Sequence, residues 1–225
     1  MRDQIDMLQQ TPWDVLIILD ACRADTFLAE CDPGAETVRS PASCTRDWVR
    51  AAGPLLAERG VRYYTANSYV TRDNRRYRLG LDVAPLYERL TTPCGVGGAM
   101  TVHPYQVNLV VQADPAARQR LSKGGAIVVH YVQPHAPRLE GAPGYAATLR
   151  IVYGAARQLC AALGGRWVIT SDHGELLGEQ GRWGHYCGMD CDALRLVPWL
   201  AGEAPAAPAA RVTVLDNLRH LGYVA

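Results

Sequence analysis

The sequence predicts an α/β protein built on a mostly parallel sheet, and two observations lead to this fold class. Short apolar runs of the kind that parallel sheets bury on both faces alternate with stretches of helical character along the 225 residues. Four of these runs also stop abruptly at polar groups, which are Asp20, Asn67, His135 and the pair Asp172-His173. Because parallel strands end at the same edge of a sheet, where ligands bind, we expect these polar groups to meet there.

Size and composition favour one domain without a polyanionic or membrane partner. A chain of 225 residues can bury a full core, and its formal net charge is only +1. The longest strongly apolar runs are about six residues, far short of the roughly 20 that span a bilayer, and residues 1–10 lack the apolar centre of a signal peptide. The seven cysteines form an odd set without a Cys-x-x-Cys pair, which is typical of reduced thiols in the cytosol. We therefore expect a soluble, cytoplasmic protein that binds no nucleic acid, and the sequence leaves its oligomeric state open.

The first predicted elements are a short helix and a central strand. Residues 2–10 have an amphipathic pattern that ends at Thr11-Pro12, and residues 14–20 form an apolar run that fits a strand buried on both faces. This strand ends in Asp20. Its carboxylate can be the N-cap of the next helix or a metal ligand at the sheet edge, and the local sequence does not decide between these roles.

A cluster of small hydroxyl and thiol side chains, residues 40–45, leads into a predicted helix over residues 46–52, which Gly53-Pro54 interrupts. A hydroxyl at a helix N-terminus is usually a cap. The alternative is a nucleophile, because the helix dipole and the free N–H groups there stabilise an anionic phosphoryl or sulfuryl group. Thr45 is the best placed candidate, and Ser43 is the next.

The following segment is less informative. Residues 61–67 predict a strand that ends in Asn67, whose amide can donate to an oxyanion. Residues 71–78 hold four arginines, and we expect a solvated loop there, with the rim of an anionic substrate site as the alternative. Between residues 79 and 123 prolines break the pattern, so we assign no function, and we expect His103 at the surface.

Residues 126–132 form the next apolar run, which continues towards His135. Prolines on both sides of His135 fix the backbone and prevent a helix, so its ring is held at a strand end. His130 lies inside the run, and we expect it to pack or form a hydrogen bond within the strand.

A crossover helix over residues 143–163 then delivers the chain to a strand over residues 167–170 and to Asp172-His173. A carboxylate oxygen and an imidazole nitrogen side by side suit a hard or borderline cation. The sequence closes with a predicted strand over residues 194–200 and a terminal helix over residues 211–221.

Several motifs follow one another in order along nearly the whole chain: ILDACRAD at 18–25, QPHAP at 133–137, SDHGE at 171–175, GRWGH at 181–185, RLVP at 195–198 and LRHLGY at 218–223. Together with the hydroxyl cluster through Thr45, they resemble the sulfatase-like branch of the alkaline phosphatase superfamily. The SDHGE and GRWGH motifs are the most specific, and the segment around Thr45 is the loosest.

The resemblance implies a three-layer α/β sandwich with an alkaline phosphatase-like core, a divalent metal at the sheet edge, and attack on phosphorus or sulfur by a metal-activated side chain. The residues that match the metal ligands are Asp20, Thr45, Asp172 and His173. The ion would be zinc, with manganese, magnesium or calcium as alternatives, and Thr45 would be the nucleophile. His135 and His185 would contact the transferred group or the leaving oxygen, or hold a second metal, and Asn67 would contact a non-bridging oxygen.

The chain also departs from the family pattern. Cys44 lacks the Cys-x-Pro-x-Arg surroundings that sulfatases need to form formylglycine, which favours a phosphate over a sulfate ester. Ala21 stands beside Asp20 where calcium-type sulfatases pair two aspartates, and Tyr131 stands where two-metal members carry an aspartate. These changes favour one ion, as in the phosphoethanolamine transferases. Because typical members are much longer, we expect residues 1–225 to form a single domain that lacks most of the usual C-terminal subdomain.

The sequence thus predicts a metal-dependent hydrolase of phosphoric esters, a phosphatase or phosphodiesterase with Thr45 as nucleophile, and sulfuric esters are the less favoured substrates. Two alternatives stay open. A phospho-group transferase would use the same site with an alcohol acceptor, and a catalytically inactive binding protein would have kept the fold and lost the chemistry.

Overall fold

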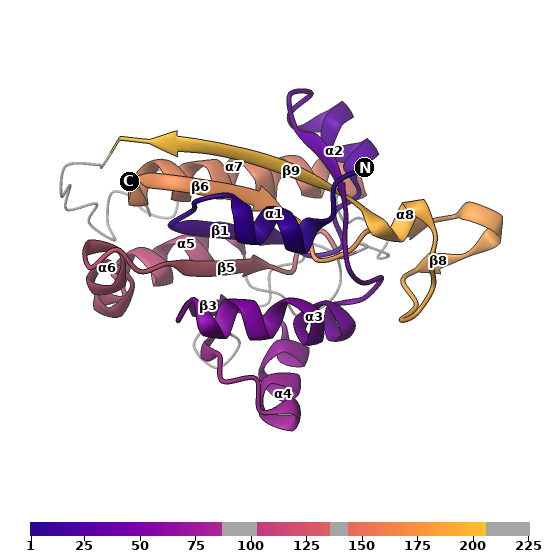
Figure 1. Ribbon diagram of the computed structural model, residues 1–225. Coiled ribbons are helices and arrows are strands. Elements are labelled where there is room, and N and C mark those ends of the chain that lie inside the picture. Colours follow the sequence, from indigo (N-terminus) through magenta and orange to yellow (C-terminus); the bar gives the residue numbers. More distant parts are fainter. Residues whose placement is uncertain (87–102, 136–143, 206–225) are drawn as a thin grey trace.

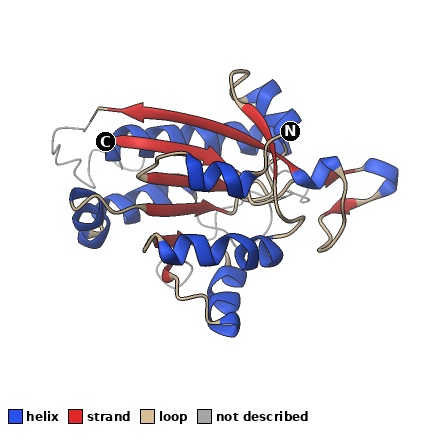
Figure 2. Ribbon diagram, in the orientation of Figure 1, coloured by secondary structure: helices blue, strands red, loops and turns tan. Residues whose placement is uncertain are grey.

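Figure 1 shows the protein as a computed structural model, which describes residues 1–86, 103–135 and 144–205. A seven-stranded sheet runs through its centre in the order β2-β9-β6-β1-β5-β3-β4. Helices cover both faces of this sheet (Figure 2). The described part of the chain is therefore a three-layer α/β sandwich with a mostly parallel sheet, and the predicted fold class is confirmed.

The strands fall into three groups. Five neighbouring strands are parallel: β6 (Gly165–Thr170), β1 (Val15–Leu19), β5 (Ile127–Tyr131), β3 (Arg62–Thr65) and β4 (Asp82–Pro85). Strand β9 (Leu196–Ala204) is antiparallel both to β6 and to the edge strand β2 (Glu36–Arg39). A separate hairpin pairs β7 (Leu176–Leu177) with β8 (Trp183–Gly184).

The helices divide between the two faces of the sheet. One face packs against α2 (Ala24–Glu30), α5 (Pro104–Ala113), α6 (Pro115–Ser122) and α7 (Tyr145–Leu163). The other face packs against α1 (Gln4–Gln10), α3 (Thr45–Glu58) and α4 (Ser68–Tyr77). A 3-10 turn, Glu179–Gly181, links β7 to β8, and the short helix α8 (Asp192–Arg195) precedes β9.

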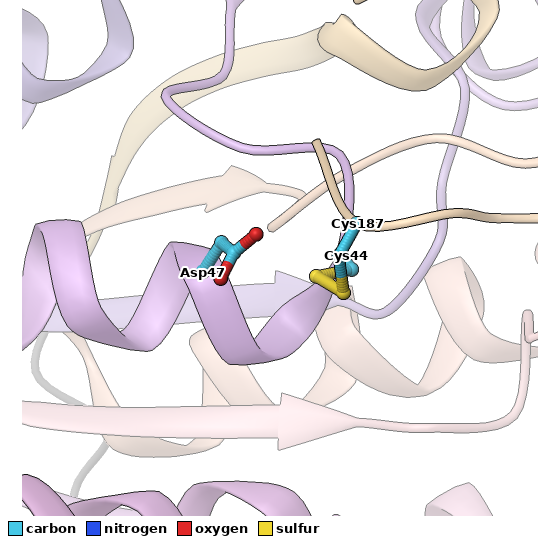
Figure 3. A group of neighbouring side chains, drawn as sticks. All are labelled: Cys44, Asp47 and Cys187. Carbon is cyan, nitrogen blue, oxygen red and sulfur yellow. A yellow bond between two sulfur atoms is a disulfide. The ribbon is translucent and has the colours of Figure 1, made fainter. Parts of the chain in front are cut away.

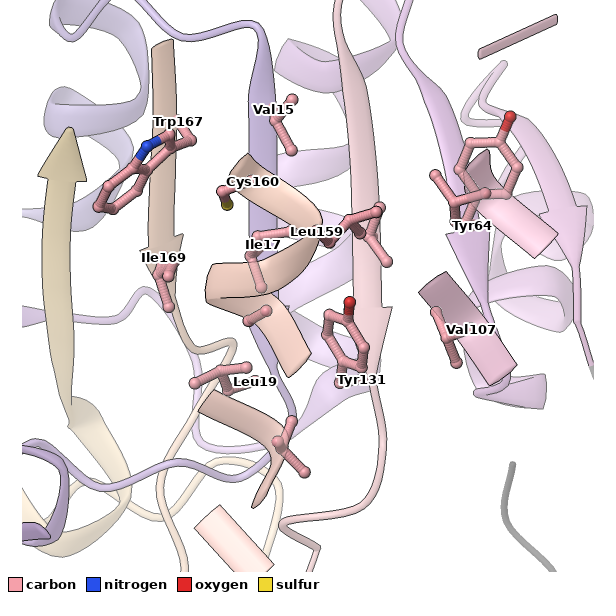
Figure 4. Packing of buried hydrophobic residues seen from close by; sticks show 14 of the residues in the cluster. Val15, Ile17, Leu19, Tyr64, Val107, Tyr131, Leu159, Cys160, Trp167 and Ile169 are labelled. Carbon is pink, nitrogen blue, oxygen red and sulfur yellow. The ribbon is translucent and has the colours of Figure 1, made fainter. Parts of the chain in front are cut away.

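The apolar run of β1 supplies both cores because successive side chains of a strand point to opposite faces. Val15, Ile17 and Leu19 join the core beneath α7, part of which is seen from close by in Figure 4. Leu16 and Ile18 join the core beneath α3. All five side chains are fully buried, as expected for a central parallel strand.

The predicted helix over residues 46–52 is longer than expected, since α3 continues through Gly53-Pro54 to Glu58. Pro54 cannot donate the hydrogen bond that Arg50 would accept. Both residues lie on the exposed side of α3, where water can hydrate the freed carbonyl oxygen of Arg50. The helix therefore tolerates its internal proline.

The fully buried side chain of Gln4 fixes α1 against the rest of the fold. Its amide nitrogen donates to Thr170 Oγ1 at 2.8 Å and to the carbonyl oxygen of Ser171 at 2.7 Å. Its amide oxygen accepts from Trp48 Nε1 at 2.9 Å. One side chain thus joins α1, α3 and the carboxyl end of β6.

Residues 71–78 form most of α4, so the expectation of a solvated loop was wrong. Asn67 is the N-cap, and its side-chain oxygen accepts from the backbone N–H of Tyr69 at 2.9 Å. Val70 and Asp73 are buried, while arginine, a good helix former, occupies most of the outer positions. Charge alone therefore gave the wrong secondary structure. The anionic-substrate rim stays a prediction.

The other sequence-based predictions fare differently. The helix over residues 2–10 and the crossover helix over residues 143–163 are confirmed as α1 and α7, and the five predicted strands are confirmed as β1, β3, β5, β6 and β9. His103 is half-buried and caps α5 rather than lying free on the surface. The predicted helix over residues 211–221 lies outside the described residues, and the single-domain organisation stays a prediction.

Candidate active site

The carboxyl ends of four neighbouring parallel strands bring polar side chains to one place. Asp20 follows β1, His173 and Asp172 follow β6, Asn67 follows β3, and His130 is the last but one residue of β5. The even-numbered residues of β1, β5 and β6 face α3, so the alternation of the strands turns Asp20, His130 and Asp172 towards that helix. The strand ends therefore converge on the N-terminus of α3, where Thr45 is the first residue.

Asp20, Asp172 and His173 form the innermost group. One ligand atom from each lies within 4.8 Å of the other two, and all three residues are fully buried. Asp172 is held firmly, because its Oδ1 accepts from the backbone N–H of His173 at 3.0 Å and of Ala21 at 3.2 Å. The predicted Asp20 and Asp172-His173 thus share one site.

Thr45 completes this group. Its hydroxyl donates to Asp172 Oδ2 at 2.7 Å and lies 3.2 Å from His173 Nε2. The N-cap residue of α3 is Cys44, which makes no side-chain capping bond, so Thr45 does not serve as the cap. Its hydroxyl instead points at a pair of buried acidic and imidazole side chains, at a helix N-terminus that favours negative charge.

Asn67 uses both ends of its amide. The oxygen caps α4, and the nitrogen donates to Asp20 Oδ2 at 2.7 Å and lies 3.4 Å from Thr45 Oγ1. A donor at this position can contact an anionic oxygen bound beside Thr45. Asn67 therefore lies where the sequence analysis expects it.

His130 is the member of the site that the sequence analysis missed. Its Nε2 lies 3.2 Å from Asp20 Oδ2 and 3.8 Å from Asp172 Oδ2, and its Nδ1 lies 2.9 Å from the hydroxyl of Tyr63. Burial lowers the pKa of His130, but its contact with Asp20 and the charges of Asp172 and Asp20 outweigh this and raise the pKa. A histidine within an apolar strand, beside carboxylates on neighbouring strands, was the available signal.

Asp20 responds to the same contact. Burial raises the pKa of Asp20, yet the interaction with His130 and the nearby imidazoles of His173 and His135 hold the pKa well below its usual range. Its second oxygen, Oδ1, is buried and has no hydrogen-bond partner among the residues that the structure describes. A buried carboxylate oxygen that accepts no hydrogen bond is available to bind a cation.

A second group lies on the outer side of the first. His135, Glu175 and His185 offer ligand atoms within 4.8 Å of one another. His185 Nδ1 lies 2.9 Å from Glu175 Oε2. The centre of the His185 ring lies 4.2 Å from the centre of the His173 ring and 4.7 Å from that of the His135 ring. Burial lowers the pKa of His185, but the hydrogen bond and charge of Glu175 raise it above its ordinary value. Glu175, which the sequence analysis gave no role, is therefore the residue that orients His185.

A disulfide closes the site from the side of the hairpin. Cys44 is bonded to Cys187, so the expectation of reduced thiols was wrong for these two residues (Figure 3). Ser43, the second candidate nucleophile, donates its hydroxyl to the carbonyl oxygen of Tyr186 at 2.9 Å. Among the described residues, the cysteines that stay free are Cys22, Cys31, Cys160 and Cys191. Since disulfides persist in oxidising compartments, this bond speaks against the cytoplasmic location, which stays a prediction.

The fold and the site together define a class of protein. The chain has an alkaline phosphatase-like α/β fold, and candidate oxygen and nitrogen ligands for a metal ion gather at the edge of its sheet. The soluble domain of lipooligosaccharide phosphoethanolamine transferase A from Neisseria meningitidis is similar to this chain, with a TM-score of 0.55 and 14% identity over 94% of this chain and 78% of that one. The integral membrane protein lipooligosaccharide phosphoethanolamine transferase A from the same organism matches with a TM-score of 0.57 and 14% identity over 94% of this chain, which spans 49% of that chain. These likenesses confirm the sulfatase-like resemblance at the level of the fold.

No family model and no curated protein matches the chain. Along the described residues, no helix combines the length and the apolar character needed to cross a bilayer.

Proposed function

We propose that this protein is a metal-dependent enzyme that transfers a phospho-group from a phosphoric ester to an alcohol acceptor through a phospho-Thr45 intermediate. The observation that carries the proposal is the Thr45 hydroxyl, 2.7 Å from Asp172 Oδ2 and 3.2 Å from His173 Nε2 at a helix N-terminus. Hydrolysis was the first expectation from sequence. Transfer is now favoured because the two similar solved structures reported above are named phosphoethanolamine transferases.

The residues present fit a divalent ion. Asp20, Asp172 and His173 offer two carboxylates and an imidazole within 4.8 Å of one another, and Asp20 Oδ1 accepts no hydrogen bond from the described residues. With the Thr45 hydroxyl they offer four ligands, three oxygens and one imidazole nitrogen. Four ligands that include an imidazole suit zinc, and the carboxylate oxygens also suit manganese, magnesium or calcium. When bound, the ion supplies positive charge that acidifies the hydroxyl and stabilises the anionic transition state.

The chain's own residues account for the rest of the first half-reaction. Thr45 Oγ1 passes its proton towards Asp172, with which it is already hydrogen-bonded, and attacks phosphorus in line with the leaving oxygen. Asn67 donates to a non-bridging oxygen. His185, oriented by Glu175, gives a proton to the leaving oxygen, with His135 beside it as the alternative donor.

The second half-reaction reverses these roles. His185, now unprotonated, takes the proton of the acceptor hydroxyl, the acceptor oxygen attacks phosphorus, and Thr45 leaves and recovers its proton from Asp172. Water is the second candidate acceptor. The hydrogen-bonded pair of Glu175 and His185 favours hydrolysis as much as transfer, because it can deprotonate water as readily as an alcohol.

The test uses zinc- or manganese-loaded protein with p-nitrophenyl esters of phosphoethanolamine and of phosphate, and with p-nitrophenyl sulfate, in the presence and absence of an alcohol such as glycerol. Transfer predicts that nitrophenol release rises with alcohol and that phosphorus NMR shows a glycerol ester, whereas hydrolysis predicts the free phospho-product. Thr45→Ala should lose at least about a thousandfold in kcat, while Thr45→Ser keeps a hydroxyl and should retain part of the rate. Equal turnover by wild type and Thr45→Ala would remove Thr45 from its role.

The same measurements address the inactive-binding-protein alternative. Plasma mass spectrometry of the purified protein measures its metal content. The alternative is supported if the protein contains neither zinc nor manganese and binds neither metal when it is added. Stoichiometric metal, lost in Asp20→Asn, is expected if the protein is an enzyme.

A further inference from the structure

The disulfide joins the two segments that carry the reacting groups. Cys44 immediately precedes Thr45 and is buried, with 2% of its surface exposed, whereas Cys187 follows His185 by two residues and is exposed. Their Cα atoms lie 5.1 Å apart (Figure 3). No other covalent bond crosses the site among the described residues.

Besides the disulfide, the segment that carries His185 is held by polar and ring contacts. Its hairpin pairs only two residues on each side, and Trp183 and Tyr186 are 53% and 49% exposed. The Ser43 hydroxyl donates to Tyr186, His185 is hydrogen-bonded to Glu175, and the His185 ring contacts the rings of His135 and His173. An ion pair between Arg23 and Glu179 also ties the turn of the hairpin to the start of α2. Segments with few buried apolar contacts open at low free energy, so a covalent bond here has a large effect on position.

We propose that Cys44 and Cys187 are positioning residues. Their disulfide holds Thr45 and His185 at a fixed separation on either side of the phospho-group while it is transferred. The inference rests on the proposed function and deepens it. Each thiol loses one hydrogen when the bond forms, and the two electrons and two protons pass to a disulfide oxidant, which becomes a dithiol. A dithiol reductant reverses the step, and it reaches the bond from the side of Cys187, the exposed residue of the pair.

Loss of the bond should act on one part of the site only. Asp20 follows β1, and Asp172 and His173 follow β6, both in the middle of the sheet, so they keep their positions and metal affinity should not change. His185 stands on the hairpin and loses its fixed place opposite Thr45. A misplacement of about 1 Å of a proton donor can cost up to about a hundredfold in rate.

The experiment compares wild type with Cys187→Ala and with the double variant Cys44→Ala/Cys187→Ala. The matched control is Cys191→Ala, a free cysteine of the same segment whose thiol makes no capping bond. Peptide mapping without reductant first shows the linked peptide. Variants are preferred to simple reduction because the freed thiols and Asp47 lie within 4.8 Å of one another and could take up the added zinc.

At a temperature where circular dichroism shows each protein folded, both cross-link variants should lose at least about tenfold in kcat, with KM within about twofold and zinc affinity unchanged. The control should behave as wild type. A bond that only stabilises the fold would lower the melting temperature and leave kcat alone, and that result overturns the proposal. Unlinked cysteines in the purified wild type also overturn it.

A second measurement separates this inference from the proposed function. Orthovanadate imitates the five-coordinate transition state, and its binding to zinc-loaded protein can be followed by calorimetry without any turnover. If wild type acts on no ester, the proposed function fails, and at least about tenfold weaker vanadate binding by Cys187→Ala would still support positioning. Equal vanadate binding by the two proteins would overturn the positioning role.

Discussion

A methyl group added at Gly174 should both destabilise the protein and disturb the site. The Cβ of Gly174→Ala would lie 2.0 Å from the carbonyl oxygen of Ala193, so these atoms must separate by about 1 Å. The backbone N–H of Gly174 donates to the carbonyl oxygen of Leu194 at 2.8 Å, and that bond opposes the separation. Overpacking costs about 1–3 kcal/mol and loss of a buried hydrogen bond about 1–3 kcal/mol more, so we expect a loss of about 2–6 kcal/mol.

Urea denaturation of the metal-free protein measures this loss. Gly144→Ala is the control, because its added Cβ meets nothing within 4 Å, and it should cost no more than about 0.5 kcal/mol. Because His173 and Glu175 flank Gly174, zinc affinity should fall as well. A change below about 1 kcal/mol with unaltered zinc affinity would refute the steric argument.

Three further predictions concern single features of the fold. The Cys44–Cys187 bond spans 143 residues, so its reduction should lower the free energy of unfolding by about 5 kcal/mol on the chain-entropy relation. Guanidinium unfolding curves recorded with and without dithiothreitol measure this loss, and coincident curves would contradict it. Glu175→Gln should lower the pKa of His185 in the metal-free protein, as followed by NMR. Since the folded pKa is raised, the stability that this pair contributes is complete below about pH 6.5 and is lost as the pH rises through the folded pKa of His185; an unshifted titration argues against the pair. Gln4→Leu leaves its three buried partners unpaired and should cost about 2–4 kcal/mol in thermal denaturation, whereas a melting temperature within about 2 °C of wild type would exclude that cost.

The sheet could be predicted because its chemistry is local. A run such as Val15 to Leu19 has no polar side chain, and only a strand buried on both faces, or a buried helix too short to be stable, accommodates it. The polar residues directly after the runs, such as Asp20 and Asp172, could then be placed at one edge by the rule for parallel strands. Strand ends therefore gave most of the inner group from sequence alone.

What could not be predicted depends on contacts between distant residues. The pairing of Cys44 with Cys187 joins residues 143 positions apart, and seven cysteines allow many pairings. His130 is held by Asp20, which follows the neighbouring strand, and by Tyr63, and the contact with Asp20 raises the pKa of His130. Pro54 is tolerated only because it faces solvent, and the sequence does not specify which side of α3 is exposed.

The site draws its members from two kinds of scaffold, and this suggests where the molecule can be redesigned. Asp20 and Asp172 follow β1 and β6, two strands that are paired on both sides within the sheet, so changes around them threaten folding itself. His185 directly follows a small hairpin that pairs outside the main sheet. Variant hairpins can therefore be grafted between Leu176 and Cys187, with both of those residues retained. Under the proposed transfer, they would offer a library of altered acceptor preferences while the sheet stays unchanged.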